Sequence, residues 1–146
     1  MIRRDKSIIR RATLADVPLI VKVEELSFDV PWPDFLFKAH LNNPGFVAYE
    51  KEGNILGYAM VGDSEGKAHL QNIAVHPQCR RQGIGTELLE WCIDLVKLYG
   101  YREMILEVRQ KKTSSQAFYA NNGFKISGTV AGYYVDDDAI IMTKNI

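Results

Sequence analysis

The chain has 146 residues, 47% of them hydrophobic, which is enough for one well-packed domain over residues 1–146 and too little for two domains of ordinary size. Lysine plus arginine and aspartate plus glutamate each number 18, so the formal net charge at pH 7 is zero. With no overall field to attract a polyanion, we expect neither a nucleic-acid nor a membrane partner.

Hydrophobic periodicity and turn residues predict a strand, two helices and a hairpin in the first half of the chain. Asp16 is a suitable N-cap for the first helix, and Pro18 is tolerated in its first turn, where no N–H bond is lost. Pro31 and Pro33 each restrict the preceding residue, so the segment between the two helices is expected to be a loop. In chain order we expect a strand over 8–12, a helix to about residue 27, a loop over 28–33, a helix over 34–41 and paired strands over 46–50 and 55–61.

The second half predicts a strand, a long helix, a second strand, a short helix and a terminal hairpin. Gly100 is suited to end the long helix, because glycine readily takes the left-handed conformation that follows a last helical turn. Thr113, Ser114 and Ser115 are suitable caps for the short helix, and Gly123 is suited to end it. In chain order we expect a strand over 69–75, the long helix, a strand over 104–108, a helix over 116–121 and strands over 124–131 and 139–143.

The order of these elements predicts an α/β fold. Antiparallel strands come first, one strand–helix–strand crossover follows in the middle, and a hairpin ends the chain. We therefore expect a mixed, mostly antiparallel sheet of about seven strands with helices on both faces.

The segment from residue 72 to residue 86 is the most informative, because an apolar strand runs through a basic, glycine-bearing loop into the long helix. The first N–H groups of a helix lack partners and carry partial positive charge, which favours phosphate. Gly83 and Gly85 permit close approach to the main chain, and Arg80 and Arg81 add planar cations. The segment predicts a pyrophosphate site, with a simple glycine turn as the alternative.

Other ligand-binding motifs do not fit. The loop lacks the lysine that a P-loop requires, and Leu88 stands where a dinucleotide-binding fingerprint requires a third small residue. His40, His69 and His76 do not have the spacing of a metal-ligand set, and no paired cysteines accompany them. We expect a site without metal.

Cysteine usage and the N-terminal residues bear on location. Cys79 and Cys92 give no disulfide framework, and charged residues stand where a signal peptide requires an apolar core. No apolar run approaches the roughly 20 residues that span a bilayer. We expect a soluble protein of the cytoplasm.

Two residues in the second half are candidates for chemistry. Glu107 lies in an apolar run, where a carboxylate is unusual unless it is paired or used, and an ion pair with Arg109 or exposure at a sheet edge are the structural alternatives. Tyr119 lies at a helical interval that is more typical of core than of a catalytic site.

Four motifs, taken with their separations, resemble the GCN5-related N-acetyltransferase (GNAT) superfamily. They are N-I-A-V over 72–75, R-x-x-G-x-G over 80–85, L-E-V-R over 106–109 and Y-x-x-x-G-F over 119–124. The set is similar to the RimI-type branch, which acetylates the N-terminal α-amine of proteins. Ser27-Phe28, Pro31-Trp32 and Tyr133-Tyr134 extend the resemblance over most of the chain.

The resemblance implies a GNAT fold, acetyl-CoA as cosubstrate and a peptide N-terminus as acceptor. It implies that Glu107 is the general base, that Tyr119 is the general acid and that the Val75 N–H polarises the thioester carbonyl. It assigns acetyl-CoA contacts to Ile73, Ala74, Val75, Arg80, Arg81, Gln82, Gly83, Ile84, Gly85 and Thr86. Lys112 stands where bacterial relatives usually carry an asparagine that contacts the cofactor, so we expect it either to meet the cofactor's phosphates or to face water. The residues implied to flank the peptide N-terminus are Phe28, Pro31, Trp32, Tyr133 and Tyr134.

Three functions remain open at this point. An α-amine has a pKa near 7.7–8.0, whereas a lysine side chain near 10.4 costs about 3–4 kcal/mol more to deprotonate at neutral pH, so a carboxylate base suits an α-amine. The same fold acting on a small amine such as a polyamine would favour an acidic groove, for which Asp136 to Asp138 is the only acidic run. A non-catalytic acyl-CoA-binding module would require neither Glu107 nor Tyr119.

Overall fold

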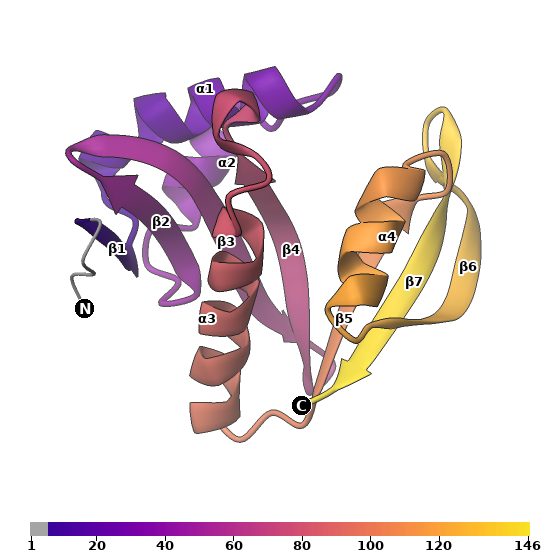
Figure 1. Ribbon diagram of the computed structural model, residues 1–146. Coiled ribbons are helices and arrows are strands. Elements are labelled where there is room, and N and C mark those ends of the chain that lie inside the picture. Colours follow the sequence, from indigo (N-terminus) through magenta and orange to yellow (C-terminus); the bar gives the residue numbers. More distant parts are fainter. Residues whose placement is uncertain (1–5) are drawn as a thin grey trace.

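The computed structural model describes residues 6–146, which form seven strands, four α-helices and two short 3-10 helices around one mixed sheet (Figure 1). Residues 1–5 of the predicted domain lie outside the described residues. The strands are β1 (Ser7–Arg11), β2 (Phe46–Lys51), β3 (Asn54–Ser64), β4 (Lys67–Val75), β5 (Glu103–Arg109), β6 (Lys125–Tyr134) and β7 (Asp137–Asn145). The helices are η1 (Leu14–Asp16), α1 (Val17–Ser27), α2 (Asp34–Ala39), η2 (Pro77–Cys79), α3 (Ile84–Leu98) and α4 (Thr113–Asn121).

The strand order is β1-β2-β3-β4-β5-β7-β6, and the neighbours are antiparallel except for β4 and β5, which are parallel. The expected mixed sheet with a central strand–helix–strand unit is confirmed. Within residues 6–146, no helix is long and apolar enough to cross a membrane.

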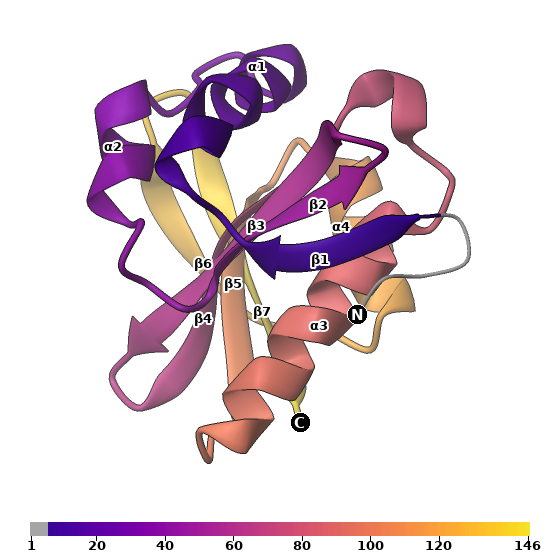
Figure 2. The same cartoon turned by 90° about the vertical axis from the view of Figure 1, so that its left-hand side faces the viewer.

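Helices cover both faces of the first four strands because side chains alternate along each strand. In Figure 2, α1 and α2 lie on one side of β1, β2 and β3, and α3 lies on the other. Between α1, α2 and the sheet is a core that includes Ile20, Phe37, Phe46, Tyr58 and Met60. The core beneath α3 continues across β5 and β7 to α4 and includes Leu70, Leu88, Cys92, Leu106, Phe124 and Met142.

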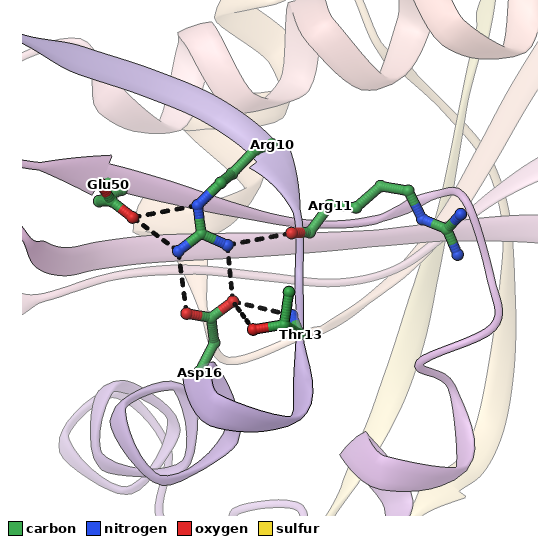
Figure 3. A network of polar contacts seen from close by, with 5 residues as sticks. All are labelled: Arg10, Arg11, Thr13, Asp16 and Glu50. Carbon is green, nitrogen blue, oxygen red and sulfur yellow. Dashed lines mark hydrogen bonds and ion pairs between the residues drawn. The ribbon is translucent and has the colours of Figure 1, made fainter.

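The first helix begins at Val17, directly after Asp16, as expected, but it is not capped as expected. Its first turn holds Pro18, but Asp16 makes no side-chain cap and belongs to η1. The Asp16 carboxylate instead accepts bonds from the Thr13 N–H at 2.8 Å and from Arg10 at 2.7 and 2.9 Å, while Arg10 also binds Glu50 at 2.6 Å (Figure 3). Asp16 is therefore the N-cap residue by position, but the expected side-chain cap is wrong, because a guanidinium from β1 bonds to the same carboxylate.

The later helices differ from expectation mainly at their starts. Gly100 ends α3 with φ +91°, and Gly123 follows α4 with φ +90°, as expected. The last helix begins at Thr113, before the expected residue 116, and no side chain caps it. The final hairpin is longer than expected, so Tyr133 and Tyr134 lie at the end of β6.

The feature that positions the site is the separation of β4 from β5. The two strands pair only at Ala68 with Met104 and at His69 with Ile105, and beyond these pairs they diverge, as Figure 1 shows. The register between β3 and β4 also shifts between Met60 and Val61, which leaves Gln71 as an extra residue in β4. The last residues of β4 therefore border a gap between neighbouring strands.

Candidate active site

The end of β4 presents main-chain groups to this gap. Gly57 lies opposite Val75, and the His76 N–H donates to the Leu56 carbonyl at 2.7 Å, which makes Gly57 and Val75 a non-hydrogen-bonded pair. The N–H and C=O of Val75 therefore point away from β3 and toward the side on which β5 has diverged. Ile73 lies two residues earlier and has the same orientation.

The predicted phosphate loop continues directly from this strand into α3. Arg81 and Gly83 take left-handed conformations with φ +64° and +81°, and Gly83 is the residue before the first helical turn. A Cβ on Gly85 would lie 3.3 Å from the Phe118 ring, so this glycine also allows α3 to approach α4. The loop thus gathers helical N–H groups and arginines at one end of the gap.

Of the two basic residues Arg80 and Lys112, Arg80 has contacts that the sequence did not predict. Arg80 donates from Nε to the Val75 carbonyl at 3.2 Å and from a terminal nitrogen to the Ser27 hydroxyl at 3.3 Å. It therefore joins the end of β4 to the end of α1. Lys112 is exposed immediately before α4, and its cofactor contact stays a prediction.

Glu107 is paired, but not with the residue that its sequence position suggested. Its carboxylate lies 2.7 Å from His69 Nε2, and the Tyr133 hydroxyl donates to the same oxygen at 3.4 Å. Arg109 instead pairs with Asp136, so the structure does not contain the ion pair between Glu107 and Arg109 that was one of the structural alternatives. Both Glu107 and His69 retain some exposure, 16% and 21% of the side chain, so a carboxylate with a cationic or hydrogen-bonding partner is open to a small ligand.

Sequence reasoning missed His69 as a site residue. Alternation along β4 puts Ala68 and Leu70 into the core beneath α3, so His69 faces the other way. Met104, Leu106 and Val108 likewise face that core, which directs Glu107 to the same side as His69. The sequence did contain the information needed to find His69. Side chains alternate between the two faces along both β4 and β5, and the strand–helix–strand crossover makes these two strands parallel neighbours.

Tyr119 approaches from the opposite face of the sheet. It packs against Phe124, with ring centroids 5.8 Å apart, and belongs to the core on the α4 side. Burial first, and then the charge of Tyr134, raises the pKa of Tyr119 well above its usual range, so the hydroxyl is a hydrogen-bond donor. Glu107 and Tyr119 therefore come from opposite faces of strands that diverge.

The predicted acceptor residues form two groups. Tyr133 and Tyr134 pack together with ring centroids 5.0 Å apart, and the Arg109 guanidinium lies 4.2 Å above the Tyr134 ring. Burial, followed by the charge of Glu107 and its hydrogen bond, raises the pKa of Tyr133. These contacts bring the Tyr133-Tyr134 group to Glu107.

The other group lies in the loop between α1 and α2. Trp32 packs on Phe37 and on His40, at 5.6 and 5.9 Å between ring centroids. Phe28 and Pro31 precede Trp32 in the same segment, and Phe28 is exposed. This loop follows α1, the helix whose last residue Ser27 contacts Arg80.

A buried carboxylate that the sequence analysis did not single out lies beneath this loop. Glu24 is 1% exposed and accepts bonds from Tyr58, Trp32 and Asn72. The sequence feature that could have revealed Glu24 is its position four residues after Ile20, which puts a charged residue on the apolar stripe of α1 that packs on the sheet.

The acidic run at residues 136–138 is used by the β6–β7 turn. Asp136 pairs with Arg109, Asp137 accepts the Lys111 N–H at 2.9 Å, and Asp138 accepts the Gly132 N–H at 2.8 Å. Across residues 6–146, no three His, Cys, Asp or Glu side chains gather as a metal site would require. The arrangement therefore suits an anionic ligand held by the loop and a nucleophile deprotonated by Glu107.

Comparison with known proteins agrees with this arrangement. The acetyltransferase (GNAT) family matches residues 15–124. The chain is 31% identical over 148 residues to a putative [ribosomal protein bS18]-alanine N-acetyltransferase of Bacillus subtilis, covering 98% of each chain. It is 34% identical over 150 residues to an N-alpha-acetyltransferase of Sulfurisphaera tokodaii, covering 92% of this chain and 90% of that one.

Solved structures include the same architecture. The ribosomal-protein-S18-alanine N-acetyltransferase of Escherichia coli superimposes with a TM-score of 0.85 at 29% sequence identity. The match covers 96% of this chain and 94% of that chain. The likeness therefore extends over the sheet, the loop before α3 and the terminal hairpin.

Proposed function

This chain belongs to the acetyltransferase (GNAT) family, and from that premise we propose that it transfers an acetyl group from acetyl-CoA to the N-terminal α-amine of protein chains. The observation that carries the proposal is the joint placement of Glu107 and the Val75 main chain at the gap between β4 and β5. Relatives named for acetylating an α-amine support the acceptor class.

The donor would bind along β4 and the loop before α3. The Ile73 carbonyl and the Val75 N–H point away from β3 and are suited to pair with the extended arm of the cosubstrate. The Ile73 N–H and the Val75 carbonyl already bond to Asn72 and Arg80. The left-handed Arg81 and Gly83 expose N–H groups at the helix start, which suit a pyrophosphate. These features fit acetyl-CoA and require no metal ligand.

In the proposed reaction, Glu107 accepts a proton from the α-ammonium group, and His69 is hydrogen-bonded to its carboxylate. The neutral nitrogen forms a bond to the thioester carbonyl carbon while the carbonyl oxygen gains charge. The Val75 N–H donates to that oxygen. The carbonyl then re-forms as the carbon–sulfur bond breaks, and the sulfur leaves with the electron pair. The nitrogen, which became cationic when it formed its bond to carbon, releases its second proton and is left as a neutral amide.

Tyr119 would assist the departing sulfur mainly as a hydrogen-bond donor. A thiolate near pKa 8.5 does not readily take a proton from a phenol near pKa 10, a step that is uphill by about 2 kcal/mol. Burial raises the pKa of Tyr119 further, which makes full proton transfer still less favourable. The sulfur would take its proton from Tyr119 late or from the proton released by the amine.

Peptides that differ only at their N-terminus test the proposal. We expect acetyl-CoA and a peptide with a free N-terminus to give a mass increase of one acetyl group on the first residue. A matched peptide with a blocked N-terminus and one lysine is expected to react much more slowly. Equal turnover of the two peptides would contradict α-amine selectivity.

A further inference from the structure

The buried carboxylate of Glu24 lies among three donors from different parts of the chain. The Trp32 main-chain N–H donates to Oε2 at 2.9 Å, Asn72 Nδ2 donates to Oε1 at 3.1 Å, and the Tyr58 hydroxyl donates to Oε1. Glu24 is therefore the point at which α1, the α1–α2 loop, β3 and β4 meet.

Asn72 extends these contacts to the donor strand. Its amide nitrogen donates to Glu24, while its Oδ1 accepts the main-chain N–H of Ile73 at 3.1 Å. An asparagine amide has one acceptor and one donor end, so both ends are used and the side chain is fixed in orientation. A continuous path of hydrogen bonds thus runs from the Trp32 N–H through Glu24 and Asn72 to the Ile73 N–H.

Stability of the core does not explain this carboxylate. Burial raises the pKa of Glu24, and the three donors offset the effect only in part. A buried carboxylate with no cation among these partners is costly compared with an apolar side chain of similar volume. The neighbouring positions of the stripe, Val17, Ile20 and Val23, are apolar and fully buried.

We propose that Glu24 is a positioning residue that, together with Asn72, holds the acceptor loop carrying Trp32 in fixed register with the donor-binding end of β4. The Trp32 ring is anchored separately on Phe37, so Glu24 controls the loop through its main chain. This inference rests on the proposed function, because that proposal identifies the loop with the acceptor and the strand with the donor.

Hydrogen exchange tests the coupling without any catalytic assay. In Asn72→Ala, which leaves the Trp32–Glu24 bond itself in place, we expect amide exchange over residues 28–33 to accelerate several-fold. Val23→Ala is the matched control. Val23 is a buried neighbour of Glu24 on α1, and its substitution should destabilise the helix without removing any hydrogen bond of the path from Trp32 to Ile73. Unchanged exchange of the loop in Asn72→Ala, or equal acceleration in Val23→Ala, would overturn the proposal.

Exchanging the carboxylate and the amide between Glu24 and Asn72 distinguishes a role in positioning the loop from a role in folding. Asn72→Asp keeps the acceptor for the Ile73 N–H but sets two carboxylates together. We expect the KM for the acceptor peptide to rise on the order of tenfold, the effect of losing one hydrogen bond to a charged group. We expect the KM for acetyl-CoA to stay within twofold. Adding Glu24→Gln restores a donor and an acceptor and should bring the peptide KM back toward that of the wild type.

Equal changes in both KM values, or no recovery in the double variant, would overturn the proposal. The two readouts also distinguish this inference from the proposed function. If another amine proves to be the acceptor, the exchange result is unaffected and the same KM comparison is made with that amine. Accelerated loop exchange with no acetylation of α-amines would support the coupling and contradict the acceptor assignment.

Discussion

At the scale of single residues, the proposed chemistry depends on side chains placed around the gap between β4 and β5. Glu107 has His69 at 2.7 Å and Tyr133 at 3.4 Å, so its carboxylate is oriented from two sides. Tyr119 lies on the other face of the sheet, packed against the core on the α4 side, and burial raises the pKa of its hydroxyl. A base and a hydrogen-bond donor on opposite faces suit a transfer in which an amine enters and a thiolate leaves.

Removing the charge of Glu107 should slow turnover. We expect Glu107→Gln to lower kcat by about 100-fold, the lower end of the range for general acid–base catalysis, since part of an α-amine is already neutral. Glu103→Gln is the matched control on the same strand, where the carboxylate pairs with Lys67 at 3.7 Å. Steady-state kinetics of both variants check this, and a change in Glu107→Gln of less than threefold would remove the residue from the mechanism.

The state of Tyr119 sets the expected pH profile. Because burial raises its pKa above 10, the hydroxyl keeps its proton throughout the range in which an α-amine ionises. We expect kcat/KM to rise with pH as the α-amine deprotonates near pH 8 and then to stay level to pH 10. A falling limb below pH 10 that disappears in Tyr119→Phe would show that the phenol ionises earlier than its surroundings predict.

At the scale of elements, the loop between β4 and α3 carries the donor assignment. Gly83 has φ +81°, and a Cβ there would meet no atom within 4 Å, so an alanine would strain the backbone without a clash. Gly66 in the β3–β4 turn has φ +84° and equally open surroundings. The two glycines therefore have the same backbone conformation and equally open surroundings, and they differ in the loop to which they belong.

We expect Gly83→Ala and Gly66→Ala to lower the free energy of unfolding by similar amounts, about 1 kcal/mol each, because both force an L-residue into the left-handed region. Only Gly83→Ala should raise the KM for acetyl-CoA several-fold, since the strained turn moves N–H groups assigned to the pyrophosphate. Denaturant unfolding and steady-state kinetics measure the two effects. A rise in KM in both variants would mean that strain alone is responsible.

The elements that the sequence predicted best are those fixed by local patterns. Alternation and turn residues were sufficient for all the strands, and the glycines at 100 and 123 ended their helices as expected. The first helix starts after Asp16 as expected, but the expected side-chain caps at Asp16 and at Thr113 to Ser115 were wrong, because no side chain caps either helix. The bonds of Asp16 to Arg10 are tertiary, and no local preference for a cap foresees them.

The site residues that the sequence missed share a different cause. His69 meets Glu107 across 38 positions, and Glu24 meets Asn72 across 48. Each pair depends on the order of strands in the sheet and on the register of β4. The strand and loop motifs, by contrast, are contiguous in sequence and were found without the fold. The roles assigned to Glu107, Tyr119 and the loop stay predictions until variants are measured.

At the scale of the whole molecule, the N-terminal edge of the sheet is joined to the first helix by one arginine. Arg10 on β1 bonds to Asp16 before α1 and to Glu50 on β2 (Figure 3). The Asp16 side chain is only 8% exposed, so the pair is partly shielded from water. The network fixes the helix that carries Glu24 and leads to the loop between α1 and α2.

This network makes a pH-dependent contribution to stability. The bond from Arg10 holds the pKa of Asp16 below its ordinary value near 3.8, so the contribution is complete above that value and is lost as pH falls through the lower, folded-state pKa. We expect Asp16→Asn to lower the free energy of unfolding by about 1–3 kcal/mol at pH 7. The difference from wild type should shrink in acid.

Urea unfolding at pH 7 and in acid measures this effect. Asp34→Asn is the control, because Asp34 is 59% exposed and its pair with Lys38 should contribute less than about 1 kcal/mol. A deficit in Asp16→Asn that is the same at both pH values would contradict an electrostatic origin.

The central claim is that the residues around the gap between β4 and β5 transfer an acetyl group from acetyl-CoA to an α-amine. The most direct measurement is the position of the acetyl group, read by tandem mass spectrometry, on one peptide that carries both a free N-terminus and an internal lysine. The account predicts acetylation of the first residue by the wild-type protein at neutral pH and strong loss of that product in Glu107→Gln. Acetylation of the lysine in preference to the N-terminus, or product formation that Glu107→Gln leaves unchanged, would contradict it.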